Sequence, residues 1–302
     1  LEAALVSHSP ATSPKLQLQA AAWAAHAAWL YHHRVQGRSI YPGAGFGEVG
    51  LSGACMGAGW PRRRSLLSGV VLPAPLVLPD MEQLAATRRR LTVQLYTSTG
   101  AVRVSSSAQR SAAASTHARG VAGHMSDGRT QSAYLCSAGA YPCDARLLVD
   151  ASNAYRHVMS AQGLEYGPSF QGSQGALWIT RGRHRRGWCV RAQLALPHPL
   201  TSSHFCSHPI LLDSSMQLGA VAASAGGEAA APSHGSLPRG GSMVPAGFEL
   251  LACGDGQSGS KTMALAHSQE HGGTRRGTQS QFSEHHVLAC TAAAHLRRLE
   301  SR

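Results

Sequence analysis

Residues 33–48 read HRVQGRSIYPGAGFGE and contain the pattern H-x-x-x-G-x-x-x-x-P, formed by His33, Gly37 and Pro42. Gly37 and Gly43 permit backbone conformations that a side chain would forbid, and proline suits the first turn of a helix. The segment therefore predicts a tight turn that opens a helix, with His33 held at the rim of a cavity. The pattern alone is weak, because the chain contains 17 His, 33 Gly and 15 Pro in 302 residues.

A second stretch, residues 208–217, reads HPILLDSSMQ. Asp213 is a favoured residue type for the first, capping position of a helix, so we expect a helix to begin there. Gln217 lies four residues further on, on the same helix face, where its amide can orient the Asp213 carboxyl group. Because the surrounding residues are mostly apolar, the stretch predicts a carboxyl group buried beside an amide.

The rest of the chain divides into two blocks, residues 1–121 and 148–302, joined by a linker over residues 122–147 that is rich in small and polar residues. Each block is expected to contain one central helix and several strands, an internal duplication of architecture. In the first block we expect a helix over 42–56 and strands over 70–72, 76–78, 91–96 and 102–105. In the second we expect a helix over 148–162, strands over 175–180 and 188–196, a helix after Asp213, and loops over 222–243 and 254–280.

Composition excludes several classes of protein. Apolar residues make up 43% and charged residues 14%, which excludes a wholly disordered chain. No apolar run reaches the ~18–20 residues of a membrane span. The formal charge of +12 suggests nucleic acid, but the basic residues form short scattered clusters without a zinc-finger spacing or an RNA-binding aromatic signature. An acidic protein partner fits such a diffuse basic surface at least as well.

The sequence contains no recognisable metal or nucleotide motif. The seven cysteines form no C-x-x-C pair, and the histidines include no H-E-x-x-H, so we expect reduced thiols inside a cell and no bound metal. The glycines of residues 43–47 do not have the G-x-G-x-x-G spacing of a dinucleotide loop, and no G-x-S-x-G elbow of a hydrolase is present.

Six stretches in a fixed order carry a more specific signal. They are Trp29-Leu30, the His33 pattern, Pro75 to Pro79, Thr116 to Gly120, Tyr166 to Phe170, and His208 to Gln217. In this combination the chain resembles the dehydratase domain of modular or iterative polyketide synthases, which is related to the dehydratase of animal fatty acid synthase. The resemblance implies an α+β double hot-dog fold, in which two curled antiparallel sheets each wrap around a central helix.

The resemblance also implies a reaction. A 3-hydroxyacyl chain, held as a thioester on the phosphopantetheine arm of an acyl carrier protein, loses water to give a 2-enoyl thioester, with no further cofactor. His33 would be the base and Asp213 the acid. The residues that would bind or orient the substrate are Gly37, Pro42, Gly43, Tyr166, Gly167, Pro168 and Gln217.

The partners that the resemblance implies are the acyl carrier protein, neighbouring synthase domains and a second copy in a homodimer, with no nucleic acid and no membrane. The chain starts at Leu1 without an initiator Met, so we expect a piece of a longer intracellular protein, cytoplasmic or plastid.

Other interpretations stay open from the sequence alone. His33 and Tyr166 could be core residues, Asp213 a plain helix cap and Gln217 an ordinary helix residue. The family commonly has Asp before the catalytic His, where this chain has His32, and the first helix is unusually rich in glycine. The alternative to an active dehydratase is therefore a catalytically inactive double hot-dog scaffold domain of a polyketide synthase.

Overall fold

A computed structural model describes residues 3–9, 15–21, 25–61, 65–80, 90–107, 114–124, 143–182, 187–196, 205, 208–226, 243–253, 262–271, 274–282 and 287–298. All statements below concern these residues. Among them, no helix is both long enough and apolar enough to cross a membrane.

The elements of the first half are β1 (Ala3–Ser9), β2 (Lys15–Ala21), η1 (Ala25–His32), β3 (His33–Val35), β4 (Arg38–Ser39), α1 (Gly43–Ala58), β5 (Ser65–Val71), β6 (Arg90–Tyr96), β7 (Ala101–Ser107) and β8 (Ser115–His124). Those of the second half are β9 (Cys143–Asp150), α3 (Ala151–Asn153), η4 (Ala154–Met159), η5 (Ser160–Gln162), β10 (Leu164–Tyr166), η6 (Pro168–Phe170), β11 (Ser173–Gly182), β12 (Gly187–Leu194), α4 (Pro209–Gly226), β13 (Met243–Cys253), β14 (Thr262–His271), β15 (Thr274–Phe282) and β16 (Val287–Arg298).

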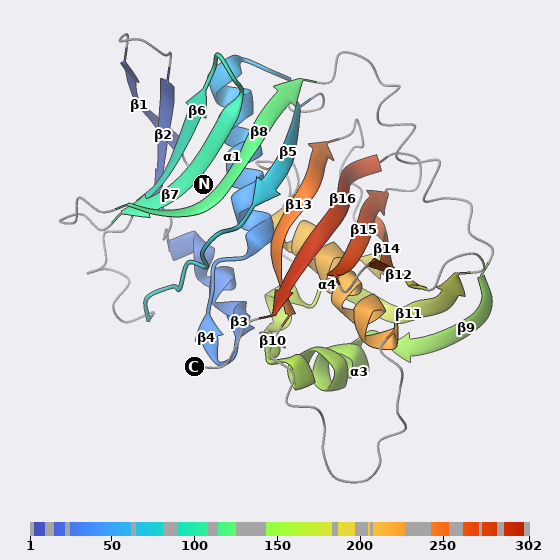
Figure 1. Ribbon diagram of the computed structural model, residues 1–302. Coiled ribbons are helices and arrows are strands. Elements are labelled where there is room, and N and C mark those ends of the chain that lie inside the picture. The colour runs from blue at the N-terminus through green and yellow to red at the C-terminus, as the bar shows by residue number, and fades with distance from the viewer. Residues whose placement is uncertain are drawn as a thin grey trace.

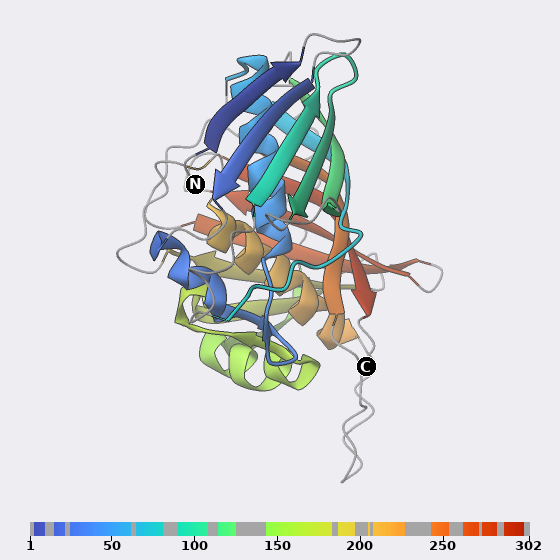
Figure 2. The same cartoon turned by 90° about the vertical axis from the view of Figure 1, so that its left-hand side faces the viewer.

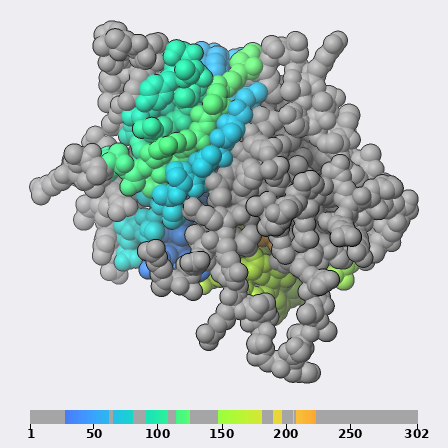
Figure 3. Space-filling model, in the orientation of Figure 1, coloured from blue at the N-terminus to red at the C-terminus, as the bar shows by residue number. Residues whose placement is uncertain are grey.

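One antiparallel sheet of 13 strands runs through both halves in the order β1-β2-β6-β7-β8-β5-β13-β16-β15-β14-β12-β11-β9. The pairing of β5 with β13 joins the two halves. The first six strands curl around α1 and the remaining seven around α4, as Figures 1 and 2 show. The expected double hot-dog architecture is confirmed. Figure 3 shows β5, β7 and β8 on the outer surface of the first half.

Helix α1 packs closely because it is rich in glycine. A Cβ atom at Gly45 would lie 2.7 Å from the ring of Tyr41, and one at Gly50 would lie 3.2 Å from Leu67 of β5. The helix ends at Gly59, whose φ of 67° is the left-handed conformation that glycine adopts without strain. The predicted helix over 42–56 is confirmed, and its glycines allow the helix to approach the sheet and Tyr41.

The helix predicted to start at Leu148 begins three residues later. Residues 148–150 belong to β9, where Leu148 pairs with Trp178 of β11. The Asp150 carboxylate then accepts a hydrogen bond from the Asn153 N–H at 3.1 Å, which caps the helical segment 151–162. The prediction missed this because strand and helix signals overlap in one apolar run.

Two further predictions are wrong. Residues 254–280 were expected to form a loop, but they include β14 and most of β15, which pair with each other in a hairpin. Ala, Ser, Gln and His in these strands lack the β-branched pattern on which strand prediction depends. The strand expected over 76–78 is only an isolated bridge between Val77 and Ile40.

The predicted strands over 91–96, 102–105, 175–180 and 188–196 are found within one or two residues as β6, β7, β11 and β12, whereas the strand predicted over 70–72 is only the end of β5, which begins five residues earlier at Ser65. Of the loop predicted over 222–243, residues 222–226 belong to α4, and residues 227–242 lie outside the described residues. The linker boundaries stay a prediction, since residues 125–142 also lie outside them; β8 ends at His124 and β9 begins at Cys143.

Candidate active site

His33 is the first residue of β3, which pairs with both β4 and β10. Its imidazole Nδ1 lies 2.8 Å from the carbonyl oxygen of Ile40. Because a carbonyl can only accept, Nδ1 carries a proton in this contact, and Nε2 is the ring nitrogen left to accept a proton. His33 is buried, with 7% of its surface exposed. The local turn therefore fixes both the direction and the tautomer of the ring.

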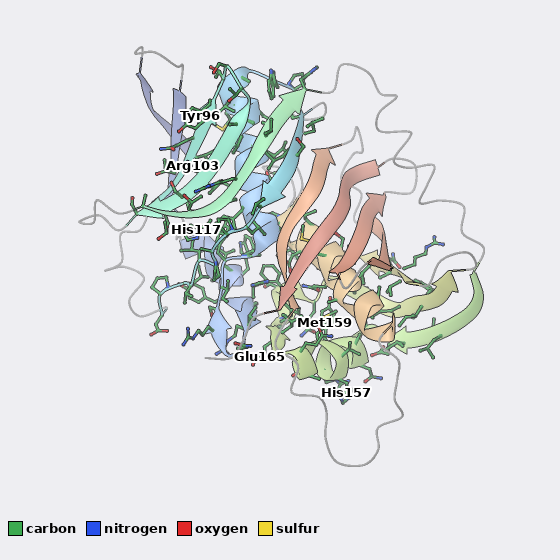
Figure 4. All side chains as sticks on the ribbon, in the orientation of Figure 1. Tyr96, Arg103, His117, His157, Met159 and Glu165 are labelled. Atoms are coloured by element: carbon green, nitrogen blue, oxygen red, sulfur yellow. The ribbon has the colours of Figure 1, made fainter. Side chains whose placement is uncertain are left out.

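Ile40 is held in place from the segment 72–80. Tyr41 N–H donates to Leu76 O at 2.9 Å and Leu78 N–H donates to Ser39 O at 2.9 Å. His117 of β8 anchors this segment, because its ring contacts Ala74 O and stacks on Phe46 of α1. Figure 4 shows His117 near the junction of β8 and the first-half helix. The Thr116 to Gly120 stretch thus supports the turn that orients His33.

Asp213 does not cap its helix, contrary to the sequence prediction. Helix α4 begins at Pro209, and Asp213 lies in its second turn. The capping group is instead His208, whose Nδ1 accepts the Ile210 N–H at 3.2 Å and whose carbonyl accepts the Leu212 N–H at 3.1 Å. A proline at the first helical position fixes this start, so the cap lies five residues earlier than expected.

The structure brings His33 and Asp213 together. His33 Nε2 lies 3.7 Å from Asp213 Oδ1, and their side chains are only 9% and 4% exposed. The pKa of Asp213 is raised above its ordinary value, mainly because burial disfavours the charged carboxylate, although His33 and the Gln217 amide lower it. Asp213 is thus set up to hold a proton beside an imidazole that can accept one.

Gln217 orients the Asp213 carboxyl group, as the spacing predicted. Its Nε2 donates to Asp213 Oδ2 at 2.8 Å and to Phe170 O at 3.1 Å. Its Oε1 accepts from the Tyr155 hydroxyl at 3.0 Å, and that hydroxyl accepts the Ser173 N–H at 3.2 Å. Burial raises the pKa of Tyr155 to about 12, so it stays a neutral donor. Both polar atoms of the Gln217 amide are hydrogen-bonded, so the amide is held in one orientation and in turn fixes the orientation of the Asp213 carboxyl group.

Two aromatic rings flank the imidazole. The ring of Tyr166 lies 5.4 Å from that of His33, and the ring of Phe170 lies 5.1 Å away in an edge-on arrangement. Burial raises the pKa of Tyr166, with Asp213 and Tyr155 adding to the effect. These rings exclude water from the space beside His33.

The other predicted residues hold the backbone around the site. Gly37 lies in the exposed turn between β3 and β4 with φ of 74°, so it shapes the turn and does not line the site. Pro42 is buried and lies directly before α1. It was predicted to be the first residue of the helix, but the helix begins one residue later, at Gly43. Gly167 N–H donates to His32 O at 2.7 Å, and Pro168 starts η6 on the exposed side.

Sequence reasoning missed Tyr155 and the cap made by His208. Tyr155 lies in η4, a π-helical turn, and such turns are frequent at functional sites but have no strong sequence signature. His208 precedes a proline, a signal for a helix start that could have moved the predicted boundary.

The arrangement is suited to proton transfer. The imidazole Nε2 of His33 and a carboxyl group with a raised pKa face each other across less than 4 Å in an apolar, aromatic setting. Among the described residues, no group of three His, Cys, Asp or Glu side chains converges as metal ligands would.

Comparisons with known proteins identify the family of the chain. A family model described as "Polyketide synthase dehydratase domain" matches residues 5–108, and one described as "Polyketide synthase dehydratase N-terminal domain" matches residues 140–245. The chain belongs to the polyketide synthase dehydratase family.

Curated relatives are much longer than the chain. The pikromycin polyketide synthase component PikAII of Streptomyces venezuelae is 32% identical over 203 residues, covering 63% of this chain. Mycoketide-CoA synthase of Mycobacterium tuberculosis is 32% identical over 194 residues, covering 62%. The chain spans about 5% and 4% of the lengths of these two synthases.

Solved structures share the fold. The dehydratase domain from the CurJ module of curacin polyketide synthase has a TM-score of 0.75 at 16% identity, with 97% of this chain and 94% of that one covered. A variant of the PpsC dehydratase domain from Mycobacterium tuberculosis has a TM-score of 0.74 at 20% identity, with 98% of each chain covered.

Proposed function

We propose that the chain is an active dehydratase domain that removes water from a 3-hydroxyacyl thioester and releases a 2-enoyl thioester. The observation that carries this proposal is the pairing of His33 Nε2 with Asp213 Oδ1 at 3.7 Å, in a site where Nδ1 is already committed to Ile40 O. An imidazole that was only a core residue would not need a free Nε2 opposite a buried acid.

His33 acts as the base. The thioester acidifies the C2–H bond, and Nε2 takes that proton while the electron pair forms the C2–C3 double bond. Ile40 O stabilises the imidazolium that results, because it already accepts the Nδ1 proton. The rings of Tyr166 and Phe170 keep bulk water from competing for Nε2.

Asp213 acts as the acid. Hydroxide is a poor leaving group, so the C3–O bond breaks as the protonated carboxyl delivers its proton and water departs. Burial raises the pKa of Asp213 and so favours its protonated form before the reaction, and Gln217 holds Oδ2 so that Oδ1 faces the substrate. Afterwards His33 carries a proton and Asp213 a negative charge, and transfer from Nε2 to Oδ1 restores the starting state.

The N-terminus of α1 is the proposed place for the thioester oxygen. The first N–H groups of a helix lack partners within it, and Gly43 opens α1 directly after the turn that carries His33. Because the Gly45 N–H already donates to Pro42 O at 2.9 Å, we assign the N–H groups of Gly43 and Ala44 to polarise the thioester carbonyl as an oxyanion hole does.

The proposed substrate arrives on the phosphopantetheine arm of an acyl carrier protein, and the domain needs no cofactor of its own. Membership of the family and the length of the relatives support a place beside other synthase domains. A charge of +12 suits an acidic carrier protein. A second copy as a dimer partner remains part of the proposal.

Variants of the related curacin dehydratases support the role of a His and an Asp. A His-to-Phe variant of the CurJ dehydratase and an Asp-to-Asn variant of the CurK dehydratase have been solved, and each is described as inactive.

The test is to incubate the chain with a 3-hydroxyacyl thioester and follow the enoyl product. We expect His33→Ala and Asp213→Asn each to lower kcat at least ~1000-fold, as loss of an acid or base typically costs ~100- to 10,000-fold. Thermal denaturation confirms that both variants fold. Product formation by His33→Ala at the wild-type rate would contradict the assignment, and no product from wild type would favour the inactive scaffold.

A further inference from the structure

His32, the residue directly before His33, contacts a different part of the chain from its neighbour. We propose that His32 is a positioning residue that clamps the segment 166–170 in place and, through that segment, aligns both His33 and Asp213. The inference deepens the proposed function and rests on it for its catalytic consequence.

The clamp consists of three hydrogen bonds. The carbonyl oxygen of His32 accepts the Gly167 N–H at 2.7 Å, which extends the pairing of β3 with β10 by one residue. The imidazole Nδ1 of His32 accepts the Ser169 N–H at 3.3 Å and lies 2.8 Å from the Ser169 hydroxyl. Backbone and side chain of one residue therefore hold a segment 137 positions away in sequence.

The acceptor role of Nδ1 fixes the state of the ring. A nitrogen that accepts from a backbone N–H cannot carry a proton, so His32 has the tautomer with its proton on Nε2. This is the opposite tautomer from that of His33, whose Nδ1 donates to Ile40 O. Two adjacent histidines thus use the same ring atom in opposite ways.

The close approach of the backbone at residue 167 to the side chain of His32 requires glycine at this position. A Cβ atom there would lie 2.8 Å from Cγ of His32, closer than real side chains come. Its φ of −73° is ordinary, so glycine is needed for space alone.

Segment 166–170 contacts His33 directly and is connected to Asp213 through Gln217. At one end, Tyr166 pairs with His33 across β10 and β3 and packs its ring against the imidazole. At the other end, Phe170 packs on His33, and its carbonyl accepts from Gln217, which holds Asp213. Ser169 lies between the two ends. Figure 4 shows β10, marked by Glu165, beside the helical segment marked by Met159.

A displacement of Ser169 would therefore move the ring beside His33 and the carbonyl that anchors Gln217 together. Misplacement of reacting groups by about 1 Å can cost up to ~100-fold in rate. The clamp explains how a base and an acid from different halves of the chain keep a common geometry.

Two substitutions of similar size test the clamp. Asn places Oδ1 three bonds from Cα, as His places Nδ1, so His32→Asn keeps an acceptor for the Ser169 N–H. Leu has nearly the same shape but no acceptor, so His32→Leu removes the bond. The readouts are amide hydrogen exchange of residues 166–170 and the separate kcat and KM of a small 3-hydroxyacyl thioester.

We expect His32→Leu to speed exchange at Ser169 at least ~5-fold and to lower kcat about tenfold, the effect of ~1.4 kcal/mol, with KM changed less than about twofold. His32→Asn should stay within about twofold of wild type in every readout. Equal behaviour of the two variants would overturn the proposal. A wild-type chain without activity would defeat the proposed function, and the exchange comparison would then decide the clamp by itself.

Discussion

The two central helices occupy corresponding places in the two halves but differ in what they bury. Helix α1 buries glycines that let it approach Tyr41 and the sheet, together with Glu48, which accepts a hydrogen bond from Ser52 of the same helix at 2.6 Å. Helix α4 buries polar side chains instead, and Asp213, Ser214, Ser215 and Gln217 are all nearly inaccessible.

The difference shows that the architecture is duplicated and the chemistry is not. The first half supplies His33 from the turn that precedes its helix, whereas the second supplies Asp213 from inside its helix. Each group alone is an ordinary buried residue. Only the fusion of both halves along β5 and β13, and of β3 with β10, puts them 3.7 Å apart.

The largest expected difference between the two helices is in how acidic pH affects the stability that their caps provide. Helix α4 is capped by a buried histidine, whereas Pro42 before α1 has no side chain that can cap. Burial lowers the pKa of His208 from 6.5 to about 4. The unfolded chain therefore binds the proton first, so stability is lost as pH falls from 6.5 through 4, by about 2 kcal/mol between pH 7.5 and 5.

His208→Asn separates this effect from other titrations. Asn also caps helices, through Oδ1, but does not titrate in this range. Urea denaturation at the two pH values should show the variant losing about 2 kcal/mol less than wild type. An identical loss in both proteins would mean that the His208 ring is not buried neutral.

The contrast between the helices also marks where the sequence was informative. Both helices, His33 and the pairing of Asp213 with Gln217 could be predicted, because they depend on local turns and on a spacing of four residues. The cap was misplaced from His208 to Asp213 because aspartate is the more common capping residue. The hydrogen bond of Tyr155 with Gln217 and the contact of Ser169 with His32 could not be predicted, because each joins residues at least 60 positions apart in the sequence.

A smaller effect is expected from filling the space around α1. Gly45→Ala gains up to ~1 kcal/mol of helix propensity, but its Cβ would press on the Tyr41 ring at 2.7 Å. Overpacking in a core costs ~1–3 kcal/mol, so we expect a net loss of about 1.5 kcal/mol in urea denaturation. Tyr41→Leu should relieve that loss in the double variant, and simple additivity would show that Gly45 and Tyr41 do not compete for space.

The smallest expected effect comes from a direct comparison of the two buried acidic residues, Asp213 of α4 and Glu48 of α1. Burial raises the pKa of Asp213, so the unfolded chain, which releases this proton more readily, is favoured as pH rises toward neutral. Asp213→Asn removes that penalty and should stabilise the chain by on the order of 1 kcal/mol near pH 7.5. Because the folded protein holds the Asp213 proton more tightly than the unfolded chain, the gain should shrink as pH falls. Glu48→Gln should give no such gain, since it weakens a charge-assisted bond from Ser52. An equal gain in stability from both substitutions would show that any buried acidic residue of these helices opposes folding, and that Asp213 is not special in this respect.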